Sequence, residues 1–409
     1  MAVAAHARAL VLNAGSSSLK FCVYGRHEDE GWRLDARGQV DGIGSSPRLA
    51  ANDGAGHSLI DPALSVAARD TGGAIDVLAG WLMKHYSGAH VLGVGHRVVH
   101  GGPRHAAPCV VKPEVLRDLR ALIPLAPLHQ PHNLAAIEAV AERLPGVPQV
   151  ACFDTAFHRS QSALAQLVPL PREIRDGGVQ RYGFHGLSYE YIATVLPAAA
   201  PEIADARVIV AHLGSGASLC ALRAGKSVEC TMGFTALDGL CMATRPGSLD
   251  PGVLLHLFQT LGRSPAEVET LLYEQSGLRG ISGTSGDMRA LLDDPDPRAR
   301  LAVDYFVHQA VKHVGALAAV LGGVDALVFT AGIGEHSAPI RRRICEGSAW
   351  LGVELDAAAN ETHAARISRP GSRVSAWVIP TNEELMIARH TGNLLGLTGS
   401  PVARGFGAV

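Results

Sequence analysis

The sequence predicts an α/β protein of two domains, and three observations support this prediction. Short apolar runs alternate with stretches of helical periodicity, a pattern typical of folds with parallel or mixed sheets. The chain has 409 residues, whereas a single hydrophobic core stops growing near about 250 to 300 residues. A glycine turn between two strand-like runs occurs at Gly15 and again at Gly214.

The predicted elements follow from apolar spacing. Strands are expected where apolar runs are short, at residues 9–12, 92–100, 147–153, 207–213, 326–331 and 374–380. Helices are expected where apolar residues recur every three or four positions, at residues 115–122, 133–143, 251–261 and 301–321. Residues 41–74 are rich in Gly, Ser, Ala and Asp and are expected to form an exposed excursion.

The composition favours a globular protein that binds a small ligand. Hydrophobic residues make up 47% of the chain and charged residues 18%, which disfavours disorder. The formal net charge of −2 provides no basic surface for nucleic acid or an anionic membrane. The seven cysteines form no CxxC pair, so neither a disulfide framework nor a structural zinc site is expected. Without a signal-peptide pattern or a bilayer-length apolar run, we expect a cytoplasmic protein.

An internal similarity joins the two glycine turns. The stretch ALVLNAGSSSLKFCV at residues 9–23 aligns with VIVAHLGSGASLCAL at residues 208–222. Gly15 then matches Gly214, and Asn13 falls opposite His212. Two such units predict duplicated domains that face each other across a cleft. Because glycine turns also occur in ordinary hairpins, the similarity alone leaves both interpretations open.

Three turns that follow apolar strands predict phosphate binding. Converging backbone N–H groups hold phosphate, and small residues let the backbone approach it. The first turn adds the Asn13 amide, the Ser16 and Ser18 hydroxyls and the Lys20 charge, although a serine-capped hairpin is the structural alternative. The other turns are HLGSGASL at 212–219 and VFTAGIGEHS at 328–337. Neither GxxxxGK[ST] nor GxGxxG occurs, so we expect neither a P-loop nor a dinucleotide fold.

Charged residues in apolar or glycine-rich surroundings are candidates for catalysis. Arg97 in GHRVVHGG and Arg245 in MATRPGSLDP each require an anionic partner, either a structural carboxylate or a transferring phosphoryl group. Asp154 directly follows an apolar strand, where α/β folds present polar groups to ligands, although it is also a candidate helix N-cap. His185 in RYGFHGLS lies between an aromatic residue and a glycine.

Three further candidates have plain structural alternatives. His129 and His212 resemble His185 in their surroundings, but lone histidines are commonly satisfied core groups. Glu383 and Glu384 open a predicted helix, where acids suit the helix dipole. Carboxylates there also suit Mg²⁺, which prefers one or two of them together with phosphate oxygens and water.

Ten motifs occur in the same order as in a known family. They are LNAGSSSLKF, GHRVVHGG, PLAPLHQPHN, FDTAFH, YGFHGLS, AHLGSGASL, TRPGSLDP, SGTSGDMR, TAGIGE and PTNEEL. The chain therefore resembles the acetokinase family of the actin-like, sugar kinase and Hsp70 ATPase superfamily, from about residue 9 to 391. The resemblance implies an α/β fold of two duplicated actin-like ATPase (ribonuclease H-like) domains flanking a central cleft. We expect domain I at residues 1–153 and 385–409 and domain II at 154–384.

The resemblance also implies a reaction and its site residues. The reaction is reversible phosphorylation of acetate to acetyl phosphate, with ATP and ADP as co-substrates, Mg²⁺ (or Mn²⁺) as the metal, and a homodimer as the assembly. The catalytic residues implied are Arg97, Asp154, His185 and Arg245. Arg97 also binds acetate, whose methyl group enters a pocket of Val99, Leu128 and Phe184, while Asn13 and Glu383 hold the metal. The nucleotide-binding set is Ser16, Ser18, Lys20, His212, Leu213, Gly214, Ser215, Gly216, Asp287, Met288, Arg289, Gly332, Ile333, Gly334, Glu335 and His336.

Several residues depart from the family pattern and keep alternatives open. Ser215 and His336 replace asparagines, Ala236 replaces a proline, and Asp238 and Ser248 replace other acids. The loss of the asparagine at position 215 and of the proline at position 236 favours a looser phosphate site and a wider acyl pocket, so propionate or another short acid is the alternative substrate. An altered preference for the phosphoryl donor is a further alternative. One methylene in an apolar pocket changes binding by only about 1 to 3 kcal/mol. A nucleotide-driven conformational switch is the more distant alternative.

Overall fold

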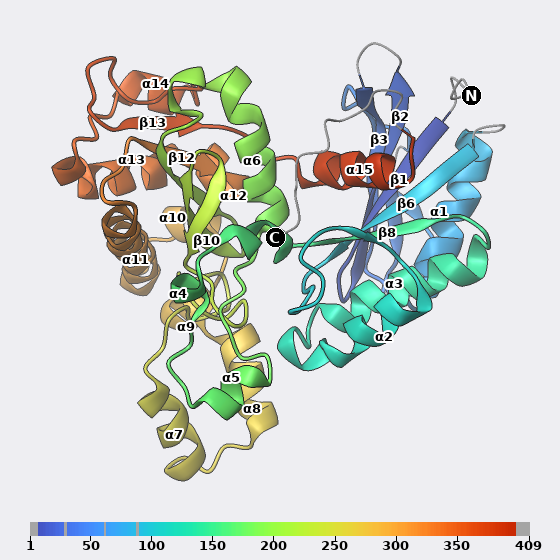
Figure 1. Ribbon diagram of the computed structural model, residues 1–409, viewed down its shortest axis with the longest axis horizontal. Helices are drawn as coiled ribbons and strands as arrows, with labels where there is room; N and C mark the ends of the chain where they lie inside the picture. The colour runs from blue at the N-terminus through green and yellow to red at the C-terminus, as the bar shows by residue number, and fades with distance from the viewer. Residues whose placement is uncertain (1–6, 28–30, 61–62, 87–89, 398–409) are drawn as a thin grey trace. The chain divides into compact units, whose positions relative to one another are not determined.

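Two compact units make up the chain. The computed structural model describes residues 7–27, 31–60, 63–86 and 90–397 (Figure 1). Of these, residues 7–156 and 382–397 form the first unit, and residues 157–381 form the second. The last part of the expected domain I, residues 398–409, lies outside the described residues. Within the described ranges, no helix is both long enough and apolar enough to cross a bilayer.

The first unit is built on an eight-stranded sheet of order β5-β4-β3-β2-β1-β6-β8-β7. Strands β1 and β2 form an antiparallel hairpin, whereas β1, β6 and β8 run parallel. The strands are β1 (Ala7–Ala14), β2 (Ser18–His27), β3 (Gly31–Asp41), β4 (Arg48–Asp53), β5 (Leu64–Ser65), β6 (His90–Val98), β7 (Cys109–Val110) and β8 (Gln149–Phe153).

Helices cover both faces of the first sheet because side chains alternate along each strand. In β6, Val94 joins the core formed with α1 (Thr71–His85) and α3 (Gln130–Arg143). The neighbouring Gly95 faces α15 (Glu383–Leu394) on the opposite side of the sheet, where a Cβ would collide with Thr391 Oγ1. Figure 1 shows α15 beside β6. This close approach seats the first turn of α15 near the end of β6. Two further helices are α2 (Pro113–Ala121) and η1 (Ile123–Leu125).

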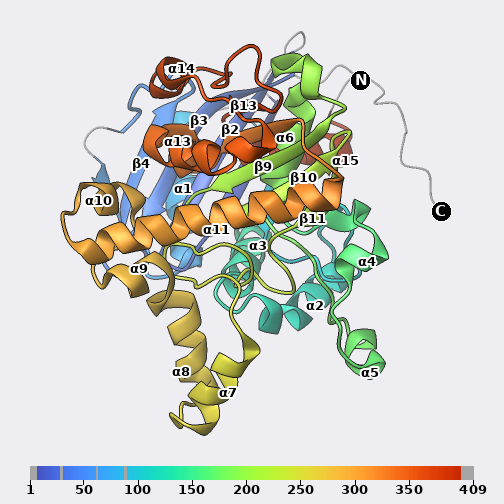
Figure 2. The same ribbon diagram turned by 90° about the vertical axis from the view of Figure 1, so that its left-hand side faces the viewer.

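The second unit contains a five-stranded sheet of order β11-β10-β9-β12-β13. The long helix α11 (Pro297–Leu321) crosses one face and contacts β9 and β10 (Figure 2). The strands are β9 (Arg207–Leu213), β10 (Ala217–Arg223), β11 (Lys226–Cys230), β12 (Ala326–Thr330) and β13 (Ser375–Val378). The other helices are α4 (Ala163–Gln166), α5 (Arg172–Asp176), α6 (Gly186–Ala199), α7 (Pro251–Gln259), α8 (Pro265–Thr270), α9 (Gly277–Ser282), α10 (Met288–Asp293), α12 (Ala331–His336), α13 (Ala338–Gly347) and α14 (Ala357–Glu361).

The two sheets repeat one topology. In the first unit, β3-β2-β1-β6-β8 has two antiparallel pairs followed by two parallel pairs. In the second, β11-β10-β9-β12-β13 has the same order and the same strand directions. The predicted duplication is therefore confirmed, and the β1–β2 hairpin corresponds to the β9–β10 hairpin.

The sequence located all six proposed strands and all four proposed helices, with bounds shifted by a few residues. The prediction that residues 41–74 form an exposed excursion is wrong for residues 48–53, whereas most of the other described residues of this stretch are exposed or half-buried. Residues Arg48–Asp53 form β4, which pairs with β3 and buries Leu49 and Ala51 in the core. Small residues made this stretch look like a loop, but Leu49 and Ala51 alternate as a half-buried strand requires. The sequence analysis also missed β3, α1 and α6.

A buried histidine in the first sheet predicts that the folded protein loses stability in acid. His96 Nε2 lies 2.7 Å from Gln149 Oε1, and Gln149 donates through Nε2 to Ile137 O, so His96 donates. Burial lowers the pKa of His96 from 6.5 to about 4. Its stabilising effect is therefore complete above pH 6.5 and is lost as pH falls through about 4.

We expect His96→Gln, which keeps an amide donor, to flatten the acid side of the stability profile. The slope of unfolding free energy against pH should decrease by up to about 1.4 kcal/mol per pH unit in this window. Urea denaturation at several pH values measures it. The matched change at exposed His256 of α7, His256→Gln, should leave the slope intact. An unchanged slope in His96→Gln would contradict the assignment.

Candidate functional site

The first predicted phosphate turn is the β1–β2 hairpin. Gly15 N donates to Ser18 O at 2.8 Å and closes the turn. Asn13 at the end of β1 pairs with Lys20 across the antiparallel ladder, so the amide and the ammonium lie on neighbouring strands. Ser16 is exposed and Ser18 is half-buried. The four predicted polar residues of this turn therefore occur within one hairpin.

Arg97, near the end of β6, is the centre of a charged cluster in the first unit. Its Nη2 lies 2.6 Å from Asp154 Oδ2 and its Nε lies 3.2 Å from Asp154 Oδ1, which is a two-pronged ion pair. Its Nη1 donates to Asn13 Oδ1 at 3.4 Å, and its Nε lies 3.8 Å from Glu383 Oε2. The structure thus brings together Asn13, Lys20, Arg97, Asp154 and Glu383.

Asp154 does not act as a helix N-cap, because both carboxylate oxygens face Arg97. Its side chain is 1% exposed, so desolvation is the main influence on it. Burial raises the pKa of the Asp154 carboxyl, and the Arg97 guanidinium opposes that shift. Burial also disfavours the charged form of Arg97, but Asp154 and Glu383 outweigh it and raise the Arg97 pKa above its ordinary value. Arg97 therefore stays positively charged.

Glu383 opens α15, capped by Asn382, which accepts from Leu385 N at 3.0 Å. Burial raises the pKa of Glu383 from 4.5 to about 7, Arg97 lowers it, and the neighbouring acids Asp154 and Glu384 raise it further. One guanidinium therefore does not neutralise the acids around it. A carboxylate oxygen and the amide oxygen of Asn13 are hard donors of the kind that Mg²⁺ and Ca²⁺ prefer, so these residues fit a divalent cation.

The three residues of the predicted methyl pocket belong to different units. Val99 is buried, and its backbone N–H donates to Asn133 Oδ1 at 3.1 Å. Leu128 is half-buried in the segment before α3. Phe184 is buried in the second unit, two residues before α6. The pocket that they are predicted to form stays a prediction.

The second hairpin brings together several predicted residues of the second unit. Gly214 N donates to Gly216 O at 3.0 Å in the turn between β9 and β10. A Cβ on Gly216 would lie 2.7 Å from Arg245 Nη2 and 3.1 Å from His185 Nε2. Only glycine leaves room for both groups at this turn. Arg245 and His185, which lie 60 positions apart in the chain, therefore face the same backbone.

His185 has an unusual backbone and a defined set of neighbours. It precedes α6 with φ of 58°, a left-handed conformation that costs a non-glycine residue free energy. Its ring stacks on His212 with 4.1 Å between centroids and 17° between planes. His185 Nδ1 lies 2.8 Å from Ser218 Oγ, and His212 Nδ1 lies 2.8 Å from Ser188 Oγ. Strained backbone of this kind often occurs at functional sites.

Arg245 and the phosphate turn share backbone contacts. Arg245 Nη1 donates to Ala236 O at 2.7 Å, and Arg245 O accepts from Met242 N at 2.9 Å. Ala243 N donates to Ser215 O at 3.1 Å and ties this loop to the glycine turn. Of the residues that depart from the family pattern, Ala236 and Ser215 therefore contact the predicted site through their carbonyl groups.

Two further departures, Asp238 and Ser248, form a pair with each other. Ser248 Oγ donates to Asp238 Oδ1 at 2.8 Å, and Arg181 Nη1 donates to Asp238 Oδ2 at 2.9 Å. A serine at position 248 satisfies one oxygen of Asp238 without adding a second negative charge. Asp238 and Ser248 are therefore structural members of one hydrogen-bond network.

A cavity of about 530 Å³ in the second unit contains half of the predicted nucleotide-binding residues. It lies between the glycine turn of β9–β10, the start of α10 and helices α12 and α13. Asp287 caps α10 by accepting from Arg289 N at 2.8 Å. The lining residues are Gly214, Ser215, Gly286, Asp287, Met288, Arg289, Leu292, Asp293, Gly332, Ile333, His336, Ser337 and Pro339.

Three of the residues predicted to bind the nucleotide do not line this cavity and instead contribute to the surrounding structure. Leu213 is fully buried in β9. Gly334 lies inside α12 and its carbonyl accepts from Arg341 Nη1 at 2.9 Å. Glu335 Oε1 accepts from the backbone N–H groups of Ala331 at 2.8 Å and Thr381 at 3.1 Å. His336 lies at the cavity and is 76% exposed.

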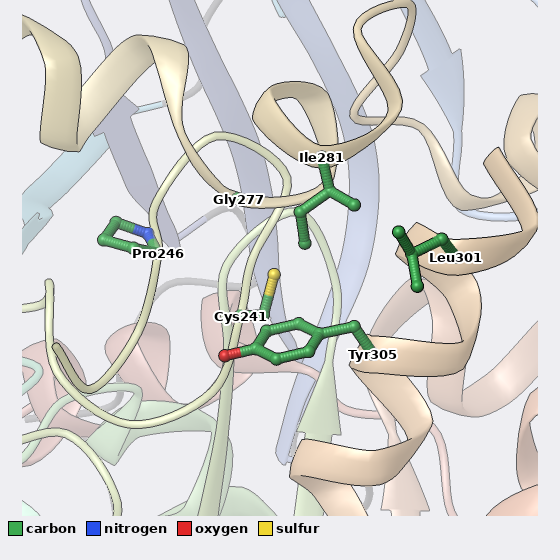
Figure 3. Close-up of a pocket in the computed structure, with 6 residues that line it drawn as sticks. All are labelled: Cys241, Pro246, Gly277, Ile281, Leu301 and Tyr305. Atoms are coloured by element: carbon green, nitrogen blue, oxygen red, sulfur yellow. The ribbon is translucent and has the colours of Figure 1, made fainter. Parts of the chain in front are cut away.

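A second, apolar pocket adjoins the loop of Arg245 (Figure 3). It has a volume of about 340 Å³ and includes Pro246, the residue that follows Arg245. Burial raises the pKa of the Cys241 thiol in its wall to about 12, which makes this thiol unreactive. The lining residues are Cys241, Pro246, Gly277, Ile281, Leu301 and Tyr305.

The sequence analysis missed two hydroxyl groups next to His185. Ser218 lies in β10 and Tyr189 lies one turn along α6 from His185, and both side chains are fully buried. The spacing of four residues between His185 and Tyr189 was a usable signal, because residues i and i+4 share one face of a helix. Ser218 stood in a quoted motif but carried no distinguishing pattern.

The comparisons with known proteins agree with this geometry. Residues 8–389 match the model of the acetokinase family. The chain belongs to this family. An acetate kinase of Nitrobacter hamburgensis is 54% identical over 94% of this chain and 96% of its own length. An acetate kinase of Rhizobium meliloti is 53% identical over 96% of this chain and 99% of its own length.

Two solved structures confirm the actin-like fold expected for the acetokinase family. An acetate kinase of Porphyromonas gingivalis has a TM-score of 0.85 and 36% identity, covering 95% of this chain and 100% of its own. A propionate kinase of Francisella tularensis has a TM-score of 0.88 and 35% identity with the same coverage. Acetokinase membership indicates a phosphotransferase that acts on a carboxyl group, with ATP or ADP as co-substrate and a divalent metal.

The charge imbalance around Glu383 predicts a pH-dependent stability. Because its pKa in the folded protein is raised to about 7 from 4.5, metal-free protein loses stability as pH rises through this window. Glu383→Gln should therefore stabilise the metal-free protein at about pH 8 by on the order of 2 kcal/mol, and not at about pH 4. Urea denaturation with a chelator present measures the difference.

Glu114 offers a matched control, since it is an exposed acid in the first turn of α2 in the same unit. Glu114→Gln should give no gain at either pH. If Glu383→Gln gave no gain at the higher pH, Glu383 would be fully compensated by its neighbours, contrary to the assignment.

Proposed function

We propose that this chain catalyses the reversible, Mg²⁺-dependent transfer of the ATP γ-phosphoryl group to acetate, which gives acetyl phosphate and ADP. The observation that carries the proposal is its acetokinase membership, with a relative named acetate kinase at 54% identity. The charged cluster around Arg97 and the cavity beside Gly214 support it, because one suits a small anion and the other a nucleotide.

The chemistry requires electrostatics more than a base. An acetate oxygen attacks the γ-phosphorus in line, the bond from that phosphorus to the β,γ-bridging oxygen breaks, and ADP leaves with that bond's electron pair. Acetate is already ionised at neutral pH, so no proton has to be removed. The barrier is the approach of one anion to another, and positioned cations and N–H donors lower it.

In the first unit, we assign the acetate carboxylate to Arg97. Asp154 holds that guanidinium in place through the contacts of 2.6 and 3.2 Å. Asn13 and Glu383 would hold Mg²⁺, with Mn²⁺ as an alternative of similar ligand preference. When bound, the metal supplies positive charge to the phosphate oxygens. Lys20 provides a further charge beside Asn13 for a nucleotide phosphate.

In the second unit, we assign transition-state stabilisation to His185 and Arg245. Both face Gly216, so a phosphoryl group at this turn would meet an imidazole N–H, a guanidinium and backbone N–H groups. We assign the rest of the nucleotide to the cavity beside the turn. Gly334 and Glu335 contribute hydrogen bonds that hold α12, one of the helices of this cavity.

A short-chain carboxylate kinase with a preference for propionate is the second candidate. Ala236 favours it, because this residue, whose carbonyl accepts from Arg245 Nη1, replaces a proline of the family pattern, and the loss of the proline is expected to widen the acyl pocket. A nucleotide-driven switch is less well supported, since it leaves Arg97 and Arg245 without a task.

We also propose a cytoplasmic homodimer. The apolar pocket of Figure 3 supports a second copy as the partner, because its rim exposes Leu301 and Tyr305 at 59% and 37%. Sedimentation velocity of the wild-type chain tests the dimer, and a single species of monomer mass would contradict it.

Hydroxylamine trapping of acyl phosphate distinguishes the candidate functions. With ATP and Mg²⁺, we expect product from acetate to exceed product from formate, propionate and butyrate, because the proposed pocket fits one methyl group. The coloured hydroxamate measures each rate. A maximum at propionate would favour the second candidate, and ATP turnover that is indifferent to every acid would favour the switch.

Removal of either arginine should abolish most turnover. We expect Arg97→Ala and Arg245→Ala each to lower kcat by about 100-fold or more, since each removes a charge that faces the transferring group. Circular dichroism should show normal folding. Arg120→Ala removes an exposed arginine of α2 and serves as the control. Near wild-type rates in either variant would exclude that arginine from the mechanism.

A further inference from the structure

Two buried hydroxyl groups lie behind the proposed catalytic imidazole. Tyr189 OH lies 2.5 Å from Ser218 Oγ, and Ser218 Oγ lies 2.8 Å from His185 Nδ1. Tyr189 and Ser218 are 0% exposed, so solvent cannot replace either contact. The three groups come from the start of α6, the next turn of α6 and the neighbouring strand β10.

The backbone around His185 is fixed independently of this chain of hydroxyls. His158 Nε2 donates to Phe184 O at 2.9 Å, one residue before His185. Burial lowers the pKa of His158 to about 4, so its ring is neutral and its Nδ1 accepts from Ser227 Oγ at 2.9 Å. A change at Tyr189 or Ser218 therefore leaves the backbone of His185 anchored by His158.

The direction of hydrogen bonding decides which ring nitrogen of His185 carries the hydrogen. A serine hydroxyl has one hydrogen and a tyrosine hydroxyl has one. When Tyr189 donates to Ser218, Ser218 donates to Nδ1, and the hydrogen of the neutral ring lies on Nε2. Nε2 is the nitrogen that faces Gly216 and the phosphate turn.

The charged and titratable groups around the ring favour this arrangement. Arg245 Nη2 faces the same point of Gly216 from the neighbouring loop, and His212 of β9 stacks on the ring at 4.1 Å. Tyr189 of α6 acts on the ring through Ser218. A guanidinium opposes a second positive charge beside it, so a neutral ring that still presents an N–H is the useful form.

We propose that Tyr189 and Ser218 are positioning residues that keep the His185 hydrogen on Nε2, where it donates to the transferring phosphoryl group without a charge on the ring. The inference rests on the role proposed for His185. It assigns a function to two residues outside the predicted site.

The proposal predicts a pH signature that a purely structural role would not give. With the hydroxyl chain intact, Nε2 donates in both the neutral and the charged ring. Without the Tyr189 hydroxyl, Ser218 can instead accept from Nδ1–H, which leaves a lone pair on Nε2. Only the charged ring then donates towards phosphate, so turnover falls as rising pH removes the charge.

The test compares kcat from about pH 6 to about pH 8.5 for wild type, Tyr189→Phe and Ser218→Ala. We expect Tyr189→Phe to lose at least about 10-fold between these limits relative to wild type, with KM for ATP and acetate changed less than about 3-fold. Ser218→Ala holds neither neutral tautomer, so it should lose a smaller factor in the same direction. Ser218→Thr retains a hydroxyl and should restore the wild-type profile. Tyr182→Phe is the matched control, because Tyr182 is a buried tyrosine of this unit whose hydroxyl donates to Gly178 O at 2.8 Å.

The outcomes distinguish the positioning role of Tyr189 and Ser218, which we call the relay, from the catalytic role proposed for His185. A loss that is equal at every pH would overturn the relay and assign Tyr189 and Ser218 to packing. Wild-type turnover in His185→Ala would overturn the proposed catalytic role itself. If His185→Ala lost turnover while both relay variants kept the wild-type profile, only the relay would be wrong.

A second measurement needs no variant. Nitrogen-15 NMR of histidine-labelled wild type should show His185 with a protonated Nε2 and an unprotonated Nδ1 at neutral pH. The opposite pattern would overturn the proposal.

Discussion

The charge balance around Arg97 is the constraint on which the first unit depends. One guanidinium faces the buried carboxylates of Asp154 and Glu383, and it contacts Asp154 more closely than Glu383. Pairing with Asp154 satisfies the arginine, while Glu383 is left with a pKa raised to about 7. A site with this excess of acid is costly in the free protein and favourable towards a cation. The free protein is therefore less stable than it would be without this acid, and the same acid favours binding of a cation. Such a loss of stability is common where polar groups are buried for function.

Close backbone approach is the corresponding constraint in the second unit. At Gly216 a single Cβ would collide with both Arg245 and His185. His185 accepts a left-handed backbone, and its imidazole is held by stacking on His212 and by Ser218. These contacts hold the imidazole of His185 in one direction, and a preorganised donor of this kind would suit the proposed phosphoryl transfer.

The sequence sufficed for the glycine turns and the alternation of elements, because both depend on local chemistry. It also singled out Arg97 and Asp154 as candidate site residues, because a charge at the end of an apolar strand requires a partner. The sequence analysis did not recognise Ser218 as a site residue, because the alignment without gaps placed it opposite Leu19. In the structure the first turn is one residue longer, so His212 pairs with Ser218 just as Asn13 pairs with Lys20. The length of a turn depends on the register in which its two strands pair, and residue types alone do not reveal that register.

This shift in register shows how one duplicated hairpin supports two kinds of chemistry. Asn13 and His212 occupy equivalent strand positions, and their cross-strand partners are Lys20 and Ser218. In the first unit the pair offers an amide oxygen and a positive charge close to two acids, which suits a metal and an anion. In the second unit it offers an imidazole and a hydroxyl beside a second imidazole, which suits N–H donation. The scaffold fixes where polar groups stand, and the residues at those positions decide what each unit can bind.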